Sequence, residues 1–215
     1  EALQLGDVAL AERLARGALD RADQSGAFDA RLALSTALAW QGRGREAEIV
    51  LGAVDAATLT EEQVMAWALP RAANQFWMLS EPERATAFLQ NVRRRVTTPS
   101  ARITLDALSG TFAMNAGQVR RAIEIADEVL TAPDSPDMAV AWSASAAALS
   151  SARMGRFAEV GPPVGAERVT ALRDEIDRGL EFSSVVLPLG RAAYLALPVL
   201  VIGAGLTSWK FSSLR

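Results

Sequence analysis

A short pattern recurs along the chain at a nearly constant interval, and this repeat constrains the fold more than any other feature. Each copy has a turn residue followed five positions later by an apolar residue. The turn residues, spaced by 36, 38, 37 and 38 positions, are Gly6, Gly42, Ser80, Gly117 and Gly155. The apolar residues are Ala11, Ala47, Ala85, Ala122 and Val160. This periodicity predicts a chain of about five similar units that stack on one another.

A second set of small residues precedes the later apolar positions by twelve residues, and it indicates what each unit is. These residues are Ser35, Ala73, Gly110 and Ala148. Two antiparallel helices can approach closely only where their crossing point lacks bulky side chains. A turn residue between them ends the first helix, because glycine adopts a left-handed backbone conformation at little cost. We therefore expect each unit to be a helical hairpin.

Helix signals surround these turns, and strand signals are missing. Apolar residues recur at three-and-four spacing after Ala47 and after Ala122, as on one face of a helix. Thr60 followed by Gln63 has the form of a capping box, and Pro99 falls between units. The sequence therefore predicts an all-α fold, a right-handed superhelix of antiparallel hairpins over residues 1–160 with units of 36–38 residues.

Composition excludes several kinds of function. The 215 residues include no histidine and no cysteine, which removes the commonest general base, the thiol nucleophile and most zinc ligands. Net charge is −3 with acidic and basic residues interleaved, so no basic surface for nucleic acid is expected. We expect a protein that is not an enzyme, holds no cofactor and makes no direct nucleic-acid contact. The polar start lacks a secretory signal, so we expect a cytoplasmic location.

Three stretches resemble a family of bacterial transcription regulators. They cover residues 9–19, 38–48 and 71–79, the last reading Arg-Ala-Ala-Asn-Gln-Phe-Trp-Met-Leu. They are similar to the tetratricopeptide-like repeat region of LuxR-type, maltose-regulator-like signal-transduction ATPases, which are common in actinobacteria. The resemblance covers about residues 1–160. It implies a sensor and assembly region that lies between a nucleotide-binding domain and a helix-turn-helix, and that binds an inducer or a protein partner.

Neither flanking domain of such a regulator is present in the sequence. No glycine-rich loop ends in Lys-Ser or Lys-Thr, and Lys210 is the only lysine. Because the chain begins at Glu1, we expect it to be a fragment of a longer protein, with ATP bound only by the missing domain. The resemblance implies a small-molecule inducer, such as a sugar, or a protein partner. A stand-alone tetratricopeptide scaffold that binds a peptide or protein is the alternative.

The register of the repeat predicts which side chains line the concave groove of the stack, where such proteins usually bind. Four of the five tryptophans fall in this set, with polar residues beside them. The candidate ligand-binding residues are Trp40, Trp67, Asn74, Trp77, Thr111, Asn115, Trp142 and Arg153. Indole rings stack on a ligand while amides and hydroxyls form hydrogen bonds to it. The alternative is that these tryptophans only pack between adjacent hairpins. Pro70, within the helix that carries Trp67, predicts a kink.

Two clusters of charge resemble sites but are better explained as surface. Glu124, Asp127 and Glu128 lie on the polar side of a predicted helix, and without histidine they indicate solvated charge and no metal site. The basic run 93–95 closes a helix and complements its dipole.

The last quarter of the chain departs from the repeat. Prolines at 162 and 163 interrupt the pattern, so we expect residues 161–215 to continue the stack irregularly. Residues 185–206 are strongly apolar, with Arg191 as their only charge. A membrane span needs about 20 apolar residues, and Arg191 together with Pro188 and Pro198 favours a buried helix instead. We expect no membrane contact, and self-association through this apolar helix.

Overall fold

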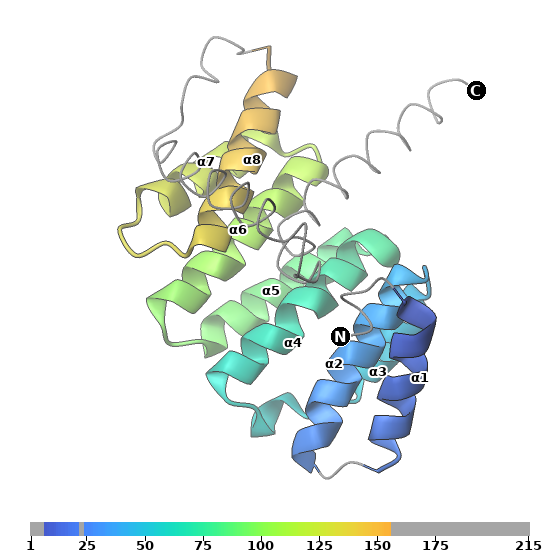
Figure 1. The fold of residues 1–215 in the computed structure, drawn as a ribbon. Helices are drawn as coiled ribbons and strands as arrows, with labels where there is room; N and C mark the ends of the chain where they lie inside the picture. Colours follow the sequence, from blue (N-terminus) through green and yellow to red (C-terminus); the bar gives the residue numbers. More distant parts are fainter. Residues whose placement is uncertain (1–6, 22–23, 156–215) are drawn as a thin grey trace, which may run out of the picture.

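The computed structural model describes residues 7–21 and 24–155, and these residues fold entirely into helices and turns (Figure 1). The α-helices are α1 (Val8–Leu19), α2 (Gln24–Trp40), α3 (Gly44–Gly52), α4 (Glu61–Ala73), α5 (Pro82–Arg95), α6 (Pro99–Asn115), α7 (Val119–Thr131) and α8 (Asp137–Arg153). A 3₁₀ turn, η1 (Ala56–Thr58), precedes α4, and a π-helical turn, η2 (Asn74–Met78), follows it. The all-α prediction is confirmed for these ranges. The predictions for residues 161–215, including the apolar helix 185–206, lie outside the described residues.

The turn residues of the repeat have the backbone conformation that the hairpin interpretation requires. Gly42, Gly117 and Gly155 have φ of 75°, 78° and 73°, and Ser80 has φ of 56°. Gly42 joins α2 to α3, Ser80 joins α4 to α5 after η2, and Gly117 joins α6 to α7. Gly155 follows α8. Ser80 is the only residue other than glycine with a positive φ in the described ranges. The sequence therefore placed these turns correctly.

The close helix crossing expected in each unit is present between α6 and α7. A Cβ atom added to Gly110 would lie 3.1 Å from Cγ2 of Ile125 and 3.8 Å from the carbonyl oxygen of Ala122. Gly110 thus lies against Ala122, as the spacing of the repeat predicts. Consecutive helices pack against each other along the chain, and the first helices of the hairpins, α2, α4, α6 and α8, also contact one another in that order.

The third hairpin departs from the expected register because its first helix ends in a π-turn. The amide of Leu79 donates to the carbonyl of Asn74 at 3.0 Å, a bond that spans five residues where an α-helix spans four. Pro70, inside α4, has no amide proton to give to the preceding turn, and a helix deforms at such a position. In consequence Ala72 is fully buried in the same core cluster as Ala85, whereas Ala73, the expected partner of Ala85, is only half-buried.

The two kinds of helix differ in how apolar side chains are distributed around them. The second helices α5 and α7 are amphipathic, with one buried stripe and a charged outer side. Of the first helices, α6 has buried residues around most of its circumference, whereas those of α4 and α8 lie on one side. A helix that is apolar all round is usually covered on both sides. No helix within the described ranges combines the length and hydrophobicity that a membrane span requires.

Candidate binding face on the first helices

Two of the predicted ligand-binding residues are buried and connect adjacent hairpins. The indole N–H of Trp67 donates to the carbonyl of Leu51 at 2.8 Å, and Nδ2 of Asn74 donates to the carbonyl of Gly44 at 2.9 Å. Both acceptors lie on α3, in the preceding hairpin. Each side chain is only 3% exposed. Trp67 and Asn74 therefore do not face an open groove, and this part of the projected register is corrected.

The π-turn explains why the projection failed here. The register of the repeat assumes α-helical spacing throughout each first helix. A π-turn holds one extra residue, and one residue of α-helix corresponds to about 100° of rotation. The side chains before η2 are therefore turned away from the expected side, and Trp67 points toward α3 and α5, where it packs edge-on against Phe88 at 5.2 Å.

Trp77 and Trp142 also pack between hairpins, but each keeps an unused donor. The ring of Trp77 lies edge-on to Phe112 of α6, with centroids 5.2 Å apart. Trp142 packs against two core clusters, one built mainly by α4, α5 and α6 and the other by α6, α7 and α8. The indole nitrogens of both tryptophans are buried and have no acceptor among the described residues. This arrangement favours the interpretation that Trp77 and Trp142 only pack between adjacent hairpins.

The polar members of the predicted set bond to backbone carbonyls. The hydroxyl of Thr111, which is buried, donates to Ala107 at 3.1 Å, and Nδ2 of Asn115 donates to Thr111 at 2.9 Å. Nη1 of Arg153 reaches the carbonyl of Met114 at 2.6 Å and so connects the end of α8 to the end of α6. Thr111 and Asn115 thus donate hydrogen bonds to carbonyls of their own helix, α6. Arg153 connects two neighbouring first helices, α8 and α6.

Trp40 is the predicted tryptophan that remains accessible. It ends α2 and is 49% exposed. A depression of about 120 Å³ is lined by Leu59, Glu61, Val64, Arg95 and Val96, and none of the eight predicted residues belongs to it. That volume is well below the roughly 300–1,000 Å³ of pockets that hold drug-sized ligands.

Sequence reasoning missed a polar joint between the second and third hairpins. Oε1 of Glu48, on α3, accepts hydrogen bonds from Arg71 at 2.9 and 3.1 Å, from Gln75 at 3.0 Å and from Arg84 at 2.9 Å. The Arg71 guanidinium also lies 5.2 Å from the ring centroids of Trp67 and Phe88. One carboxylate therefore connects α3 to α4, η2 and α5. Pro70 was the sequence signal beside this joint, since it marks the irregular helix that supplies Gln75.

The polar joint requires the backbones of α3 and η2 to approach each other very closely. A Cβ atom on Gly44 would lie 2.6 Å from Cβ of Met78 and 3.1 Å from Oδ1 of Asn74. Three buried oxygens, Glu48 Oε2, Asn74 Oδ1 and Gln75 Oε1, have no donor in the described residues. Each of these oxygens can accept a further hydrogen bond. The two arginines beside them offset the negative charge of the Glu48 carboxylate.

Two other carboxylates fix the ends of hairpins and have strongly lowered pKa values. The pKa of Glu61 falls to about 2, because the hydroxyls and then the backbone amides of Thr98 and Thr97 donate to it. The pKa of Glu12 falls to about 2, because Gln41, Arg16 and Arg43 donate to it. In both cases the donors stabilise the ionised form of the glutamate by direct hydrogen bonds. Glu61 connects α4 to the start of α6, and Glu12 connects α1 to the α2–α3 turn.

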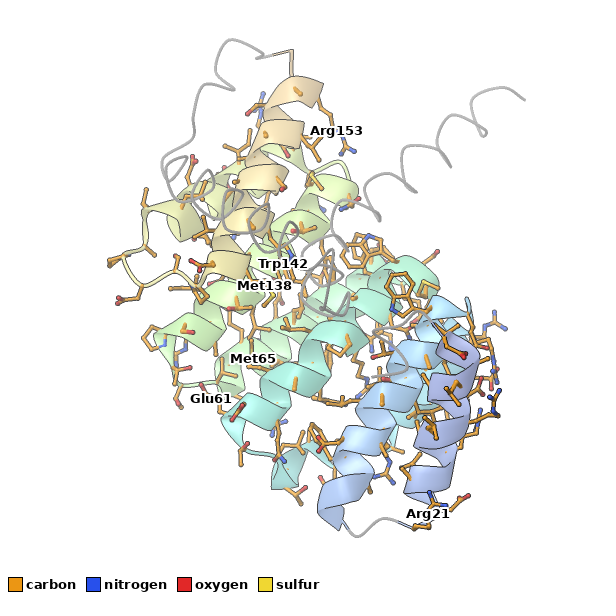
Figure 2. The ribbon with its side chains drawn as sticks, in the orientation of Figure 1. Arg21, Glu61, Met65, Met138, Trp142 and Arg153 are labelled. Atoms are coloured by element: carbon orange, nitrogen blue, oxygen red, sulfur yellow. The ribbon has the colours of Figure 1, made fainter. Side chains whose placement is uncertain are left out.

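The accessible side chains of α2, α4, α6 and α8 form what we call the first-helix face. On α4, Ala66 is exposed and Leu69 is half-buried, and no charged residue occurs from position 63 to 70. On α8, no charged residue occurs from position 138 to 152. Figure 2 shows Met65 on α4 with Met138 and Trp142 on α8, all partly accessible. Charges such as Arg121 and Glu124 are exposed on α7, and the first helices α2 and α6 also expose charges, at Asp29 and Arg102.

The described residues contain no group of three or more acidic side chains that could hold a metal ion. As expected from the sequence, Glu124, Asp127 and Glu128 are exposed on α7, and the arginines 93–95 occupy the last turn of α5.

No family model, no curated protein and no solved structure matches this chain. The first-helix face is therefore the strongest candidate for function on the evidence of the chain itself.

Proposed function

We propose that this chain is the partner-binding and assembly region of a bacterial transcription regulator, and that it binds through the first-helix face. The observation that carries the proposal is the contrast of α4 and α8 with the second helices. The second helices expose charge, whereas α4 and α8 present long uncharged stretches on their accessible sides. Uncharged, partly accessible methionine and tryptophan side chains are typical of surfaces that receive the apolar side of another helix.

The repeat supports a superhelical stack as the scaffold for this face. The positive φ values at Gly42, Ser80, Gly117 and Gly155 repeat at the spacing of the sequence pattern. In a stack of hairpins the first helices line the inner side and contact one another in order. The helices α2, α4, α6 and α8 contact one another in that order, which supports this arrangement. The resemblance of residues 9–19, 38–48 and 71–79 to regulator repeats supplies the biological setting of the proposal.

A protein segment fits the face better than a small inducer such as a sugar. Trp67, Asn74 and Thr111, which were expected to hold an inducer, are buried and already bonded within the protein. A ligand would have to break those bonds to reach them. An apolar helix of a partner requires only the surface that α4 and α8 already present.

Thermal-shift screening of the full 215-residue chain tests the proposal. One panel contains sugars and other metabolites, and a second contains amphipathic helical peptides. Each hit is then repeated with Ala66→Arg, which places charge on α4, and with Ala87→Arg, an exposed alanine of α5, as the matched control. We expect peptide hits that Ala66→Arg abolishes and Ala87→Arg retains. Hits that are insensitive to Ala66→Arg would refute binding at this face, and hits confined to metabolites would refute a protein partner.

The regulator setting is tested separately by reading the complete gene. A regulator of this kind encodes a nucleotide-binding domain before the repeats and a helix-turn-helix after them. A gene that encodes neither would leave the stand-alone scaffold as the function of the same face.

A further inference from the structure

We propose that the depression between the start of α4 and the end of α5 binds a short aliphatic group that ends in a carboxylate. This site is independent of the proposed function, because the arginine that would bind the carboxylate lies on α5, a second helix. The volume of about 120 Å³ suits one short side chain or a small organic acid, and it is too small for a drug-sized ligand. The lining residues are Leu59, Glu61, Val64, Arg95 and Val96.

The floor of the depression is apolar and belongs to the main core cluster. Val64 and Val96 are 5% and 1% exposed, and Leu59 is half-buried against the same cluster. Figure 2 shows Glu61 at the start of α4, where the depression opens at the end of the helix. Apolar groups that leave water for such a surface are stabilised by the hydrophobic effect. The floor therefore favours the aliphatic part of a ligand.

The remaining hydrogen-bonding capacity of the depression belongs to a donor. Both oxygens of Glu61 already accept bonds, from the amides and the hydroxyls of Thr97 and Thr98. Among the described residues Arg95 has one acceptor, the carbonyl of Ala56, which lies 2.9 Å from Nη2. A guanidinium has five N–H donors in a rigid plane. The Nε and Nη1 groups of Arg95 are therefore available to a ligand that supplies acceptor oxygens.

The charges beside the depression favour an anionic acceptor over a neutral one. A second guanidinium, that of Arg102, is held there by a bond from Nε to the carbonyl of Val96 at 3.0 Å. Two cationic groups thus lie beside Glu61, whose charge is already stabilised by four donors. Glu62 is exposed at the next position of α4 but does not line the depression. A carboxylate fits the planar fork of arginine with two parallel N–H bonds, which a neutral amide cannot form.

Nuclear magnetic resonance titration of the full 215-residue chain tests the proposal. The first probe is isovalerate, and isovaleramide is its neutral control. The second probe is the dipeptide N-acetyl-alanyl-valine with a free carboxylate, and the same dipeptide with an amidated terminus is its control. The signals followed are the backbone amides of Leu59, Val64 and Val96 and the Nε–H group of Arg95. Titration with sodium chloride corrects for ionic strength.

We expect saturable shifts of these signals with a carboxylate probe and none with either amide. Saturation by isovalerate alone would assign the site to a small organic acid, and saturation by the dipeptide acid alone would assign it to the end of a partner chain. Saturation by both would support the shared chemistry. Arg95→Gln should weaken binding by about tenfold or more, because a charge-assisted pair is lost. Arg120→Gln, at an exposed arginine of α7, is the matched control and should leave binding unchanged.

Three results would overturn the proposal. They are the absence of saturation by both acids, equal binding of an acid and its amide, and equal loss of affinity in Arg95→Gln and Arg120→Gln. The last of these would show that the acids respond only to the general charge of the protein. Circular dichroism establishes that each variant is folded. Arg95→Lys provides a second variant, which keeps the charge but loses the fork and should bind more weakly than the natural chain.

Discussion

Replacing Gly44 by alanine tests the close contact between the second and third hairpins. Gly44 is the first residue of α3 and lies against the π-turn. The new Cβ would lie 2.6 Å from Cβ of Met78, whereas ordinary contact begins at 3.4 Å. The atom it meets is attached directly to backbone, so a rotamer change cannot relieve the clash. The two hairpins must separate by about 0.8 Å at this point.

The expected cost follows from these distances. Overpacking of a rigid contact costs about 1–3 kcal/mol. Separation also weakens the bond from Asn74 to the Gly44 carbonyl, 2.9 Å long, which is worth about 1 kcal/mol. The higher helix propensity of alanine returns up to about 1 kcal/mol. We therefore expect Gly44→Ala to lower the free energy of unfolding by about 1–3 kcal/mol.

Urea denaturation followed by tryptophan fluorescence measures this change. Gly17→Ala in α1 is the matched control, because its Cβ would meet only the flexible end of Arg21 at 3.5 Å. That variant is expected to gain about 0.5–1 kcal/mol from the loss of glycine entropy in a helix. Met78→Gly in the Gly44→Ala background removes the clashing atom and is expected to restore part of the loss. Equal stability of Gly44→Ala and Gly17→Ala would refute the contact.

Four further changes are expected to have measurable effects. Ser80→Gly should raise the unfolding free energy by about 1 kcal/mol, because the φ of 56° strains any side chain. Glu48→Gln should lower it by about 2–3 kcal/mol, since two arginines lose their anionic acceptor. Trp67→Phe should lower it by about 1–3 kcal/mol, because the Leu51 carbonyl loses its buried donor. Stability should fall as the pH drops from about 4.5 toward 2, and Glu61→Gln should flatten this dependence.

The pH prediction follows from the direction of the shift. The pKa of Glu61 is lower in the folded protein than its ordinary 4.5, so the unfolded chain binds the proton first. The contribution of Glu61 is complete above the unfolded pKa and is lost as the pH falls through the folded value near 2. Glu12 behaves in the same way for the same reason. Thermal melts between pH 6 and pH 2 measure the effect.

Each of these changes has a control and a contradicting result. Glu124→Gln, on an exposed ion pair, should alter stability by less than about 0.5 kcal/mol, and an equal effect of Glu48→Gln would contradict the polar joint. Trp40→Phe, at the half-exposed tryptophan, should be nearly neutral, so similar losses at positions 40 and 67 would place Trp67 outside the core. A destabilising Ser80→Gly would show that its backbone is unstrained. An unchanged pH profile in Glu61→Gln would remove Glu61 as a source of acid sensitivity.

Part of the candidate site could be anticipated from the sequence and part could not. The exposed acidic stripe of α7 followed from helical spacing alone. The orientation of Trp67 and Asn74 did not, because the π-turn of η2 changes the side of α4 on which they lie. Pro70 signals a kinked helix, but the direction in which a kink turns the preceding residues depends on what the helix packs against.

The sequence by itself determined where helices begin and end, because turns and caps depend on a few neighbouring residues. The backbone freedom of Gly42, Gly117 and Gly155 and the capping box of Thr60 and Gln63 are properties of short windows, and each was readable without coordinates. The tertiary structure alone decided which side of each first helix meets its neighbour. That choice depends on groups far apart in the chain, such as Glu48 and Arg84, whose contact is set by the three-dimensional packing of two hairpins.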